Sequence, residues 1–397
     1  MASRSAELYL TATTQFGLEE VLAEELRQLG AEVVKVGNRA VEFTGNKQLL
    51  YEAVLWCRTA MRILMPFAEF EAPDEQSLYK EVSRINWSKY LSPDQTFAIT
   101  AVTNRSNLEH SLYISQLTKD AIVDQFRTRT GRRPSVDPVK PDVRLHLHLL
   151  DNQALLSLDA AGESLHRRGY RQQTNEAPLN EVLAAGLILL SGWDGKKPLI
   201  DPMCGSGTIL CEAALISQRI APGLFHQGDF AFQHWPDFEQ ALWDSVLMDA
   251  RQARIEEPQA YLAGSDLSRD TIELARQNVA AAGLEDYIRL AVRDVRDATP
   301  PKNEEQPGIL LLNPPYGERI GAEAEMAALY KTIGDTLKTN FQGYDAYIFT
   351  GNLEAAKSVG LRTSRRVPLY NGPIDCRLLK YELYRGTRKA PKEEPQA

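Results

Sequence analysis

A glycine-rich turn lies between a short apolar strand and a helix near the middle of this 397-residue chain. The strand is predicted over residues 198–200 and the helix over 209–217. A strand, a glycine-rich turn and a helix in succession present free backbone N–H groups to a ligand, and glycine lets the backbone approach it closely. The pattern indicates an α/β domain whose binding loop comprises Asp201, Pro202, Met203, Cys204, Gly205, Ser206, Gly207 and Thr208.

The spacing of this turn argues against the common phosphate-binding loops. Leu210 stands where a dinucleotide fingerprint has its third glycine, and no Lys-Ser/Thr pair follows as a P-loop requires. Cys204 lies inside the turn, so we expect it to line a cofactor pocket rather than act as a nucleophile. The ligand is therefore expected to be something other than a dinucleotide or a triphosphate.

Two further aspartates end the next two predicted strands. Asp266, with Leu267 beside it, follows a strand candidate at 260–265, and Asp294 follows one at 287–292. An acid at the tip of the second strand can accept hydrogen bonds from both hydroxyls of a ribose. Asp294 could receive an adenine amine. A single aspartate at a strand end is usually a turn or helix cap, but their order at successive strand ends favours a nucleoside site.

The tetrapeptide Asn313, Pro314, Pro315 and Tyr316 follows a fourth buried-strand signal at 308–312. The Asn313 side-chain oxygen and the Pro314 carbonyl can both accept hydrogen bonds from one planar amine. The prolines fix φ and remove two backbone donors, so the loop is stiff and rich in acceptors. The ring of Tyr316 offers a face for stacking a flat substrate. An ordinary turn is the alternative for these four residues alone, but their place after three other strand-end features favours a clamp for an exocyclic NH2 group.

These segments resemble a known family. Residues from about 165 to 382 are similar to class I S-adenosylmethionine-dependent methyltransferases of the Asn-Pro-Pro-Tyr type. The segments DPMCGSGT, GSDLS, RDV and NPPYGER, with HRRGYR and APLNE before them, resemble the bacterial large-subunit rRNA guanine-N2 methyltransferases. The first 160 residues look like the RNA-binding THUMP module that these enzymes carry.

The resemblance implies a Rossmann-like α/β sheet, S-adenosylmethionine as cofactor, and methyl transfer to the N2 amine of a guanine in 23S rRNA. It implies that the cofactor binds at 201–208, Asp266, Leu267, Asp294 and Asn313, and that 313–316 bind the target base. Accepting hydrogen bonds from both N–H groups favours the tetrahedral nitrogen of the transition state, so no covalent intermediate is required. The nitrogen gives up one proton during or after methyl transfer, and no dedicated base is required. The base must be unpaired or flipped out of its stack.

Several other functions are compatible with the same motifs. Glutamine-amide and DNA adenine methyltransferases would share the NH2 clamp, although neither substrate requires a THUMP module. A tRNA guanine-N2 methyltransferase with the same two modules is the closest alternative. A non-catalytic RNA-binding protein of ribosome assembly is an alternative of a different class, and the intact motif residues speak against it.

The chain divides into four predicted parts. Residues 1–60 are expected to form a ferredoxin-like α+β region, 61–162 the THUMP domain, 163–385 the methyltransferase domain, and 386–397 a disordered tail. An aromatic-rich insertion is predicted at 219–258; we favour a small core that holds it to the sheet over base stacking. N-terminal strands are predicted over 8–13, 33–36, 40–43, 97–103, 143–149 and 153–158, and helices over 17–29, 47–58 and 112–128.

The net charge of −8 argues against a general nucleic-acid coating protein, so RNA contacts must come from local patches. One candidate patch lies in the predicted THUMP domain and the other enters the methyltransferase domain. The candidate residues are Arg127, Arg129, Arg132, Arg133, Arg167, Arg168 and Arg171. The expected partner is 23S rRNA, unfolded or partly assembled.

Other partners and locations are constrained by what the sequence lacks. The four cysteines show no metal-ligand spacing, and His146 and His148 are expected to be ordinary strand residues, so no metal is predicted. No apolar run approaches the length of a membrane span, and the N-terminus lacks a signal-type core. We therefore expect a cytoplasmic protein without a membrane partner, and we leave its oligomeric state open.

Overall fold

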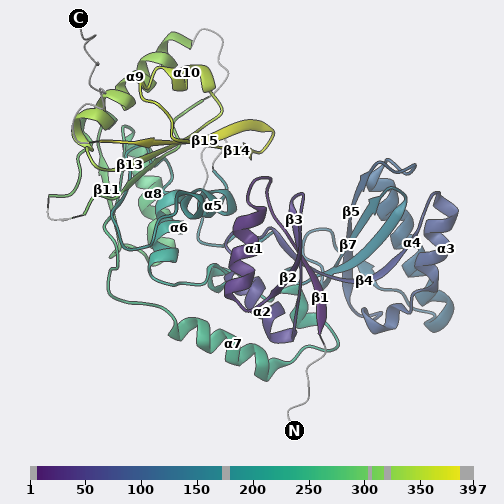
Figure 1. Cartoon of the computed structure of the whole chain (residues 1–397). Helices are drawn as coiled ribbons and strands as arrows, with labels where there is room; N and C mark the ends of the chain where they lie inside the picture. The colour runs from purple at the N-terminus through teal and green to yellow at the C-terminus, as the bar shows by residue number, and fades with distance from the viewer. Residues whose placement is uncertain (1–6, 172–178, 303–305, 317–322, 385–397) are drawn as a thin grey trace, which may run out of the picture. The chain divides into compact units, whose positions relative to one another are not determined.

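The computed structural model describes residues 7–171, 179–302, 306–316 and 323–384. By its internal contacts the chain divides into two units, Met1–Gly169 with Ala221–Ala253, and Tyr170–Ile220 with Arg254–Ala397. Each unit is built on one sheet, and several strands of each sheet are labelled in Figure 1. The tail predicted at 386–397 lies outside the described residues.

The first unit holds an eight-stranded sheet in the order β2-β3-β1-β4-β8-β7-β5-β6. The long strand β4 pairs with β1 on one side and β8 on the other, so it joins the two predicted N-terminal regions into one sheet. The sequence analysis missed β4 because Pro66 interrupts its apolar pattern, and the ladder with β8 shifts register between Pro66 and Ala68. The strands are β1 (Leu8–Thr13), β2 (Glu32–Gly37), β3 (Ala40–Gly45), β4 (Arg62–Glu71), β5 (Thr96–Asn104), β6 (Ser135–Val136), β7 (Val143–Leu150) and β8 (Gln153–Asp159).

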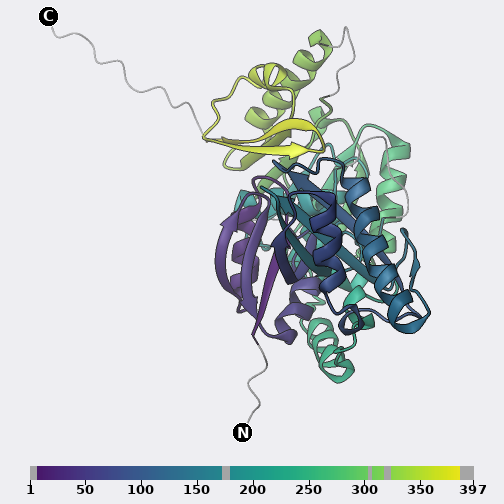
Figure 2. The same ribbon diagram turned by 90° about the vertical axis from the view of Figure 1, so that its right-hand side faces the viewer.

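Helices of the first unit bury their apolar faces on this sheet. In α1 (Glu19–Gln28) the buried face carries Leu22 and Leu26, and the turn after it has Gly30 at φ +90°, which favours glycine. Helix α2 (Lys47–Trp56) begins at Asn46, whose side chain accepts a hydrogen bond from Leu49. Figure 2 shows α3 and α4 side by side over the part of this sheet that contains β5. The remaining elements are α3 (Glu75–Arg84), which the sequence analysis also missed, η1 (Trp87–Lys89) and α4 (Ser111–Thr130).

The aromatic insertion packs within the first unit rather than on the methyltransferase sheet. Phe232 stacks on Tyr51 of α2 with ring centroids 4.4 Å apart, and Trp243 meets Phe232 edge-on at 5.0 Å. Helix α7 lies beside α2 although almost 200 residues separate them (Figure 1). The expected aromatic core is present, but its location differs from the prediction because Tyr51 and its neighbours supply the apolar partners. The insertion contains η2 (Pro222–Phe225), η3 (Ala231–His234) and α7 (Gln240–Gln252).

The second unit holds a seven-stranded sheet in the order β11-β10-β9-β12-β13-β15-β14. Strands β9 to β13 are parallel, and the hairpin of β14 and β15 adds antiparallel strands at one edge. The strand order reverses between β9 and β12, and ligands of such sheets bind at the carboxyl ends beside that switch point. The strands are β9 (Leu199–Asp201), β10 (Leu262–Asp266), β11 (Ile288–Val292), β12 (Ile309–Leu312), β13 (Asp345–Thr350), β14 (Arg365–Asn371) and β15 (Ile374–Glu382).

Helices cover both faces of the second sheet. Figure 1 shows α9 and α10 on one face and α5, α6 and α8 on the other. The core under α9 joins Tyr330, Ile333 and Leu337 to strand residues such as Leu310 and Ile348. The two helical layers make this a doubly wound α/β domain. Its helices are α5 (Glu181–Ser191), α6 (Thr208–Ser217), α8 (Arg269–Ala281), η4 (Val295–Asp297), α9 (Glu323–Asn340) and α10 (Leu353–Lys357).

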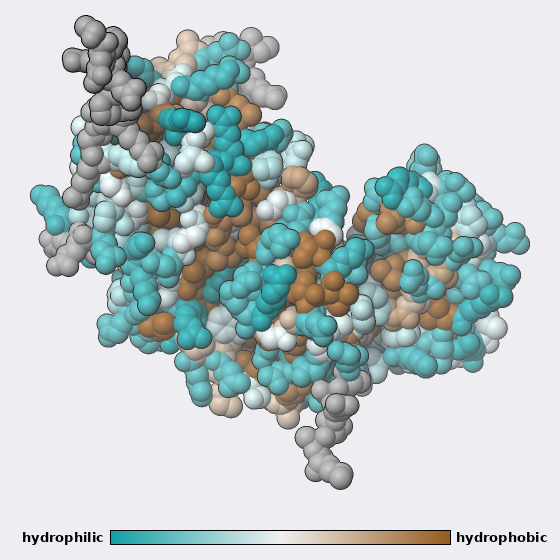
Figure 3. All heavy atoms as spheres, in the orientation of Figure 1, coloured by the Kyte–Doolittle hydropathy of each residue, from teal (hydrophilic) through white to brown (hydrophobic). Residues whose placement is uncertain are grey.

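Hydrophilic side chains cover most of the face drawn in Figure 3, with hydrophobic ones in small groups between them. Within the four described ranges, every helix falls short of the length and apolar character that a membrane span needs.

Candidate cofactor and substrate site

The glycine-rich loop leaves β9 and enters α6 through two left-handed glycines. Gly205 has φ +53° and Gly207 has φ +80°, so a side chain at either position would strain the backbone. The amide of Cys204 donates to the carbonyl of Ser265 in β10 at 3.0 Å. A Cβ on Gly264 of the same strand would lie 2.3 Å from Cδ1 of Leu210. The loop is thus pressed against β10 and held in one conformation.

Asp201 and Asp266 lie on either side of this loop. Asp201 is 1% exposed, and burial raises the pKa of its carboxyl to about 8. One of its oxygens accepts a hydrogen bond from the Met203 amide at 3.1 Å. Asp266 accepts from the Gly205 amide at 3.2 Å and from the Ser268 amide at 3.0 Å, and its side chain is half-buried. The strand-end acids therefore shape the loop even before any ligand binds.

Asp294 follows β11, but its carboxylate is occupied by its own neighbour. It accepts a hydrogen bond from the backbone amide of Arg296 at 2.8 Å and forms an ion pair with the Arg296 guanidinium at 2.7 Å. These contacts, led by the side-chain hydrogen bond, lower the pKa of Asp294. The Arg296 side chain is 71% exposed, so a ligand amine would compete with a surface ion pair, which is worth about 0–1 kcal/mol.

The tetrapeptide 313–316 emerges from the fully buried strand β12. Among the described residues, the side-chain oxygen of Asn313 is buried and has no hydrogen-bond partner. An unsatisfied buried acceptor costs about 1–3 kcal/mol, so it is uncommon unless a ligand supplies the donor. Pro314 is buried and Pro315 exposed, while Tyr316 is half-buried. Residues 317–319 of the NPPYGER segment lie outside the described residues.

One residue that supports the loop was not recognised from the sequence. The side-chain nitrogen of Asn278 in α8 donates to the carbonyl of Ser206 at 3.0 Å, and both residues are buried. Asn278 lies on the buried face of α8 with Ile272 and Ala275. A polar residue in the apolar stripe of a helix is the signal that could have identified it.

The cysteines of this site are not poised for nucleophilic attack. Burial raises the pKa of the Cys204 thiol well above its ordinary value, and the same holds for Cys211 in α6. A thiol is a nucleophile only as thiolate, so both remain inert at neutral pH. Within the described part of the chain, no three His, Cys, Asp or Glu side chains form a group that could hold a metal ion.

The arginines predicted in the THUMP domain lie on the surface at the end of α4 and just after it. The Arg127 side chain is 54% exposed with a 3.6 Å contact to Asp124, and Arg129 donates to Asn86 at 3.0 Å. Arg132 forms an ion pair with Asp94, and Arg133 is exposed. All four are accessible to a polyanion.

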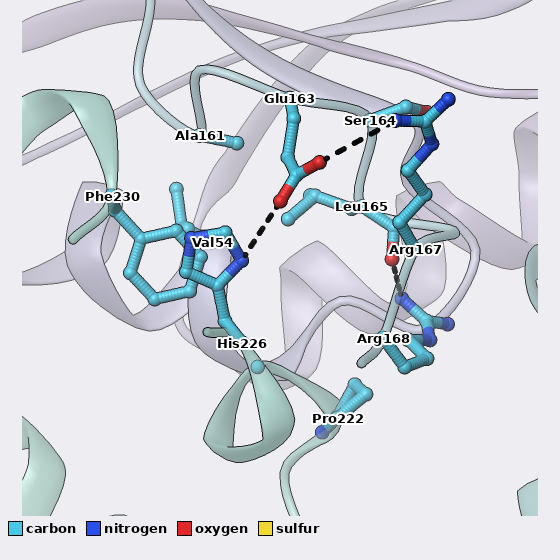
Figure 4. Close-up of a pocket in the computed structure, with 11 residues that line it drawn as sticks. Val54, Ala161, Glu163, Ser164, Leu165, Arg167, Arg168, Pro222, His226 and Phe230 are labelled. Atoms are coloured by element: carbon cyan, nitrogen blue, oxygen red, sulfur yellow. Dashed lines mark hydrogen bonds and ion pairs between the residues drawn. The ribbon is translucent and has the colours of Figure 1, made fainter. Parts of the chain in front are cut away.

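Arg167 and Arg168 point in different directions, as Figure 4 shows. The exposed Arg167 lies 3.8 Å from Glu163, whose other oxygen lies 3.6 Å from His226. Arg168 is only 3% exposed and donates to the carbonyls of Leu165, at 2.7 Å, and Arg58. Because its guanidinium binds backbone carbonyls inside the first unit, Arg168 is less accessible to RNA than Arg167, and its RNA-binding role stays a prediction.

Arg171 likewise turns inward, in the second unit. Its side chain is 11% exposed and forms an ion pair with Glu181 at 3.3 Å. It donates to the hydroxyl of Thr208, the first residue of α6, at 2.6 Å, and to the Leu179 carbonyl at 2.8 Å. The residue supports the end of the glycine-rich loop, and its contact with RNA, which this burial disfavours, stays a prediction.

Three protein-family models match successive stretches of the chain. The RlmL ferredoxin-like domain matches residues 9–64, the THUMP domain 72–159, and the RMKL-like methyltransferase domain 168–380. The last match alone covers more than half of the chain.

Relatives are similar over nearly the whole chain. A Synechocystis protein named as a candidate RNA methyltransferase is 46% identical over 373 residues, which are 94% of this chain and 96% of that protein. The ribosomal RNA large subunit methyltransferase K/L of Syntrophotalea carbinolica is 42% identical over 95% of this chain, but over 54% of its own length. The chain thus spans about half the length of that K/L enzyme. A crystal structure of a candidate methyltransferase complexed with S-adenosylhomocysteine (SAH) has a TM-score of 0.85 and 33% identity, covering 96% of this chain and 99% of that one.

Proposed function

This chain belongs to the RMKL-like methyltransferase family, and we propose that it transfers a methyl group to the exocyclic N2 amine of a guanine in 23S rRNA. The observation that carries the proposal is the buried side-chain oxygen of Asn313, which lacks a partner among the described residues. It follows β12, beside the switch point of the sheet, where a ligand with an N–H donor would satisfy it.

The residues around the glycine-rich loop fit S-adenosylmethionine, which supplies an electrophilic methyl group on sulfur. Backbone N–H groups of residues 203–207 would hold its carboxylate, and Asp266 would accept from its ribose hydroxyls. Leu267 is 73% exposed beside Asp266 and offers apolar surface to the adenine. Asp294 would accept the adenine amine once Arg296 releases one carboxylate oxygen. The 33%-identical structure with bound SAH supports this assignment.

The clamp acts on the nitrogen that is methylated. Guanine N2 is a weak nucleophile because its lone pair is delocalised into the ring. If the Asn313 side-chain oxygen and the Pro314 carbonyl accept hydrogen bonds from the two N–H groups of this amine, the nitrogen becomes more tetrahedral and its lone pair more localised. The acceptors are fixed before the reaction by the prolines and by burial, so they favour the transition state without reorganisation. Tyr316 would stack on the base.

The substrate class is supported by the N-terminal modules and by the names of relatives. One relative is named for large-subunit ribosomal RNA, and a THUMP model matches residues 72–159. Arg127, Arg129, Arg132, Arg133 and Arg167 are the accessible cations that would meet phosphates. Arg167 also lines a cleft of ≈ 580 Å³ in the first unit, together with Lys140. A protein of net charge −8 depends on such local patches for RNA affinity.

The test uses purified protein, labelled S-adenosylmethionine, unmodified 23S rRNA and bulk tRNA. After digestion to nucleosides, N2-methylguanosine from 23S rRNA alone is the expected result. The same nucleoside from tRNA alone would overturn the substrate, and a different methylated nucleoside would overturn the target atom. Asn313→Ala should lower turnover at least about 100-fold while changing cofactor affinity little, because its acceptor is used chiefly in the transition state. Equal losses in both quantities would contradict the role of Asn313.

A further inference from the structure

The hydroxyl of Tyr316 is held by the β14–β15 hairpin. It accepts a hydrogen bond of 2.7 Å from the side-chain nitrogen of Asn371, the last residue of β14. The phenol oxygen is therefore tied to the end of β14, where the hairpin turns.

The ring of Tyr316 is confined as well. Phe349 of β13 meets it edge-on, with ring centroids 6.3 Å apart and an interplanar angle of 89°. A Cβ on Gly351 would lie 3.2 Å from Cδ2 of Tyr316 and 2.8 Å from Cγ2 of Ile374. The ring thus lies close to the backbone at Gly351, where a side chain would force it or Ile374 to move.

These contacts link the loop after β12 to a hairpin that follows it by more than 50 residues. The turn between the two strands has Gly372 at φ +59° and places Asn371 opposite Ile374. We infer that Asn371 is a positioning residue for the Tyr316 ring, and that the hairpin thereby sets the plane on which the target base stacks. The inference rests on the proposed function only for the identity of the base.

The first test is a double-mutant cycle in the methylation assay. Tyr316→Phe and Asn371→Ala each remove one partner of the 2.7 Å hydrogen bond. Each is expected to lower kcat about 5- to 10-fold, with the affinity for S-adenosylmethionine unchanged, and the double variant should be no worse than either single one.

Asn340→Ala is the matched control. Its side-chain nitrogen donates to the Ala298 carbonyl at 2.8 Å in the same unit, so the variant loses a similar hydrogen bond away from Tyr316. It should leave kcat unchanged. Additive losses in the cycle, or an equal loss of kcat in Asn340→Ala, would show that Asn371 acts only through stability and would overturn the inference.

A second readout does not depend on activity. In full-length protein with ¹³C-labelled tyrosine, the Tyr316 resonance is assigned by its loss in Tyr316→Phe. Asn371→Ala should shift it, whereas Asn340→Ala should not. An unmoved Tyr316 resonance in Asn371→Ala overturns the positioning role even if the enzyme is active. A shifted resonance in a protein that methylates no RNA supports the positioning role and refutes the proposed function.

Discussion

Replacing Arg171 by alanine should impair folding and cofactor binding rather than RNA binding. The guanidinium of Arg171 lies between the Glu181 carboxylate, at 3.3 Å, and the Thr208 hydroxyl, at 2.6 Å. The two charged side chains are 11% and 5% exposed. Removing one member of a buried ion pair costs about 3–5 kcal/mol, because the other charge remains buried. For a unit of this size the melting temperature should fall by roughly 10 °C.

The effect on the cofactor follows from the position of Thr208. It is the first residue of α6, directly after Gly207, so the arginine holds the end of the loop that would bind the cofactor. We expect the dissociation constant for S-adenosylmethionine to rise several-fold in Arg171→Ala, as measured by calorimetry. RNA affinity, measured by filter binding at fixed salt, should change less than about twofold, because so little of Arg171 is accessible.

The double variant Arg171→Met/Glu181→Gln separates the ion pair from its surroundings. Replacing both members of a buried pair is often close to neutral for stability, so the double variant should recover most of the lost melting temperature. Arg133→Ala is the matched control on an exposed arginine and should leave the melting temperature unchanged. If Arg171→Ala lowered RNA affinity strongly while stability and cofactor affinity stayed at wild-type values, the structural role assigned here would be refuted.

Three further predictions concern the loop, the aromatic insertion and the RNA surface. Asp201 has a folded-state pKa of about 8 but ionises near pH 4 when unfolded, so keeping this carboxyl buried lowers the free energy of unfolding more and more as pH rises through this window, by at most about 1.4 kcal/mol per pH unit. In the ligand-free protein, the melting temperature of Asp201→Asn should therefore rise relative to that of the wild type from about pH 5 to about pH 8. A difference in melting temperature that does not change with pH would contradict the raised pKa of this carboxyl. Phe232→Ala should lower the free energy of unfolding of the first unit, measured in urea, by about 3–5 kcal/mol, because the Phe232 ring stacks on Tyr51 with centroids 4.4 Å apart. The affinity for the cofactor should stay unchanged. A loss of cofactor affinity without a loss of stability would contradict this placement of Phe232. Arg133→Ala should weaken RNA binding and reduce the magnitude of the salt slope by about 1, whereas an unchanged slope would remove this residue from the phosphate contacts.

Regular elements with clean periodicity were predictable from sequence. The strands at 8–13 and 143–149 and the helix at 112–128 agree with β1, β7 and α4 to within about two residues. The sequence analysis failed at β4, where Pro66 and a register shift break the alternation that identifies strands. Without β4 the continuity of the eight-stranded sheet was invisible, because strand pairing is a long-range property that local patterns do not encode.

The position of the candidate site was predictable for those residues that directly follow a parallel strand. The loop at 201–208 and the acids Asp266 and Asp294 all follow parallel strands of one sheet, so their order along the chain translates into proximity. The exposure of the arginines was harder to predict, since the adjacent side chains of Arg167 and Arg168 are exposed and buried, respectively. Which of two neighbouring cations turns inward depends on carbonyls such as that of Arg58, more than 100 residues away in the chain. Asn371 was missed for the same reason, because only tertiary structure brings its hairpin to Tyr316.

The features that destabilise the ligand-free protein coincide with the proposed functional residues. Asn313 holds a buried acceptor that no described residue satisfies, and Asp201 is a carboxyl whose ionised form is disfavoured by burial. An apolar side chain at position 313 would avoid the penalty of about 1–3 kcal/mol for the unsatisfied acceptor. Such local conflicts are expected where structure serves ligand binding, and a ligand that relieves them binds the folded state alone. The cofactor and the amine-bearing base should therefore each raise the melting temperature, and the gain from the base should be smaller in Asn313→Ala, because that variant no longer has the acceptor to satisfy, while Tyr316 and the Pro314 carbonyl still contact the base.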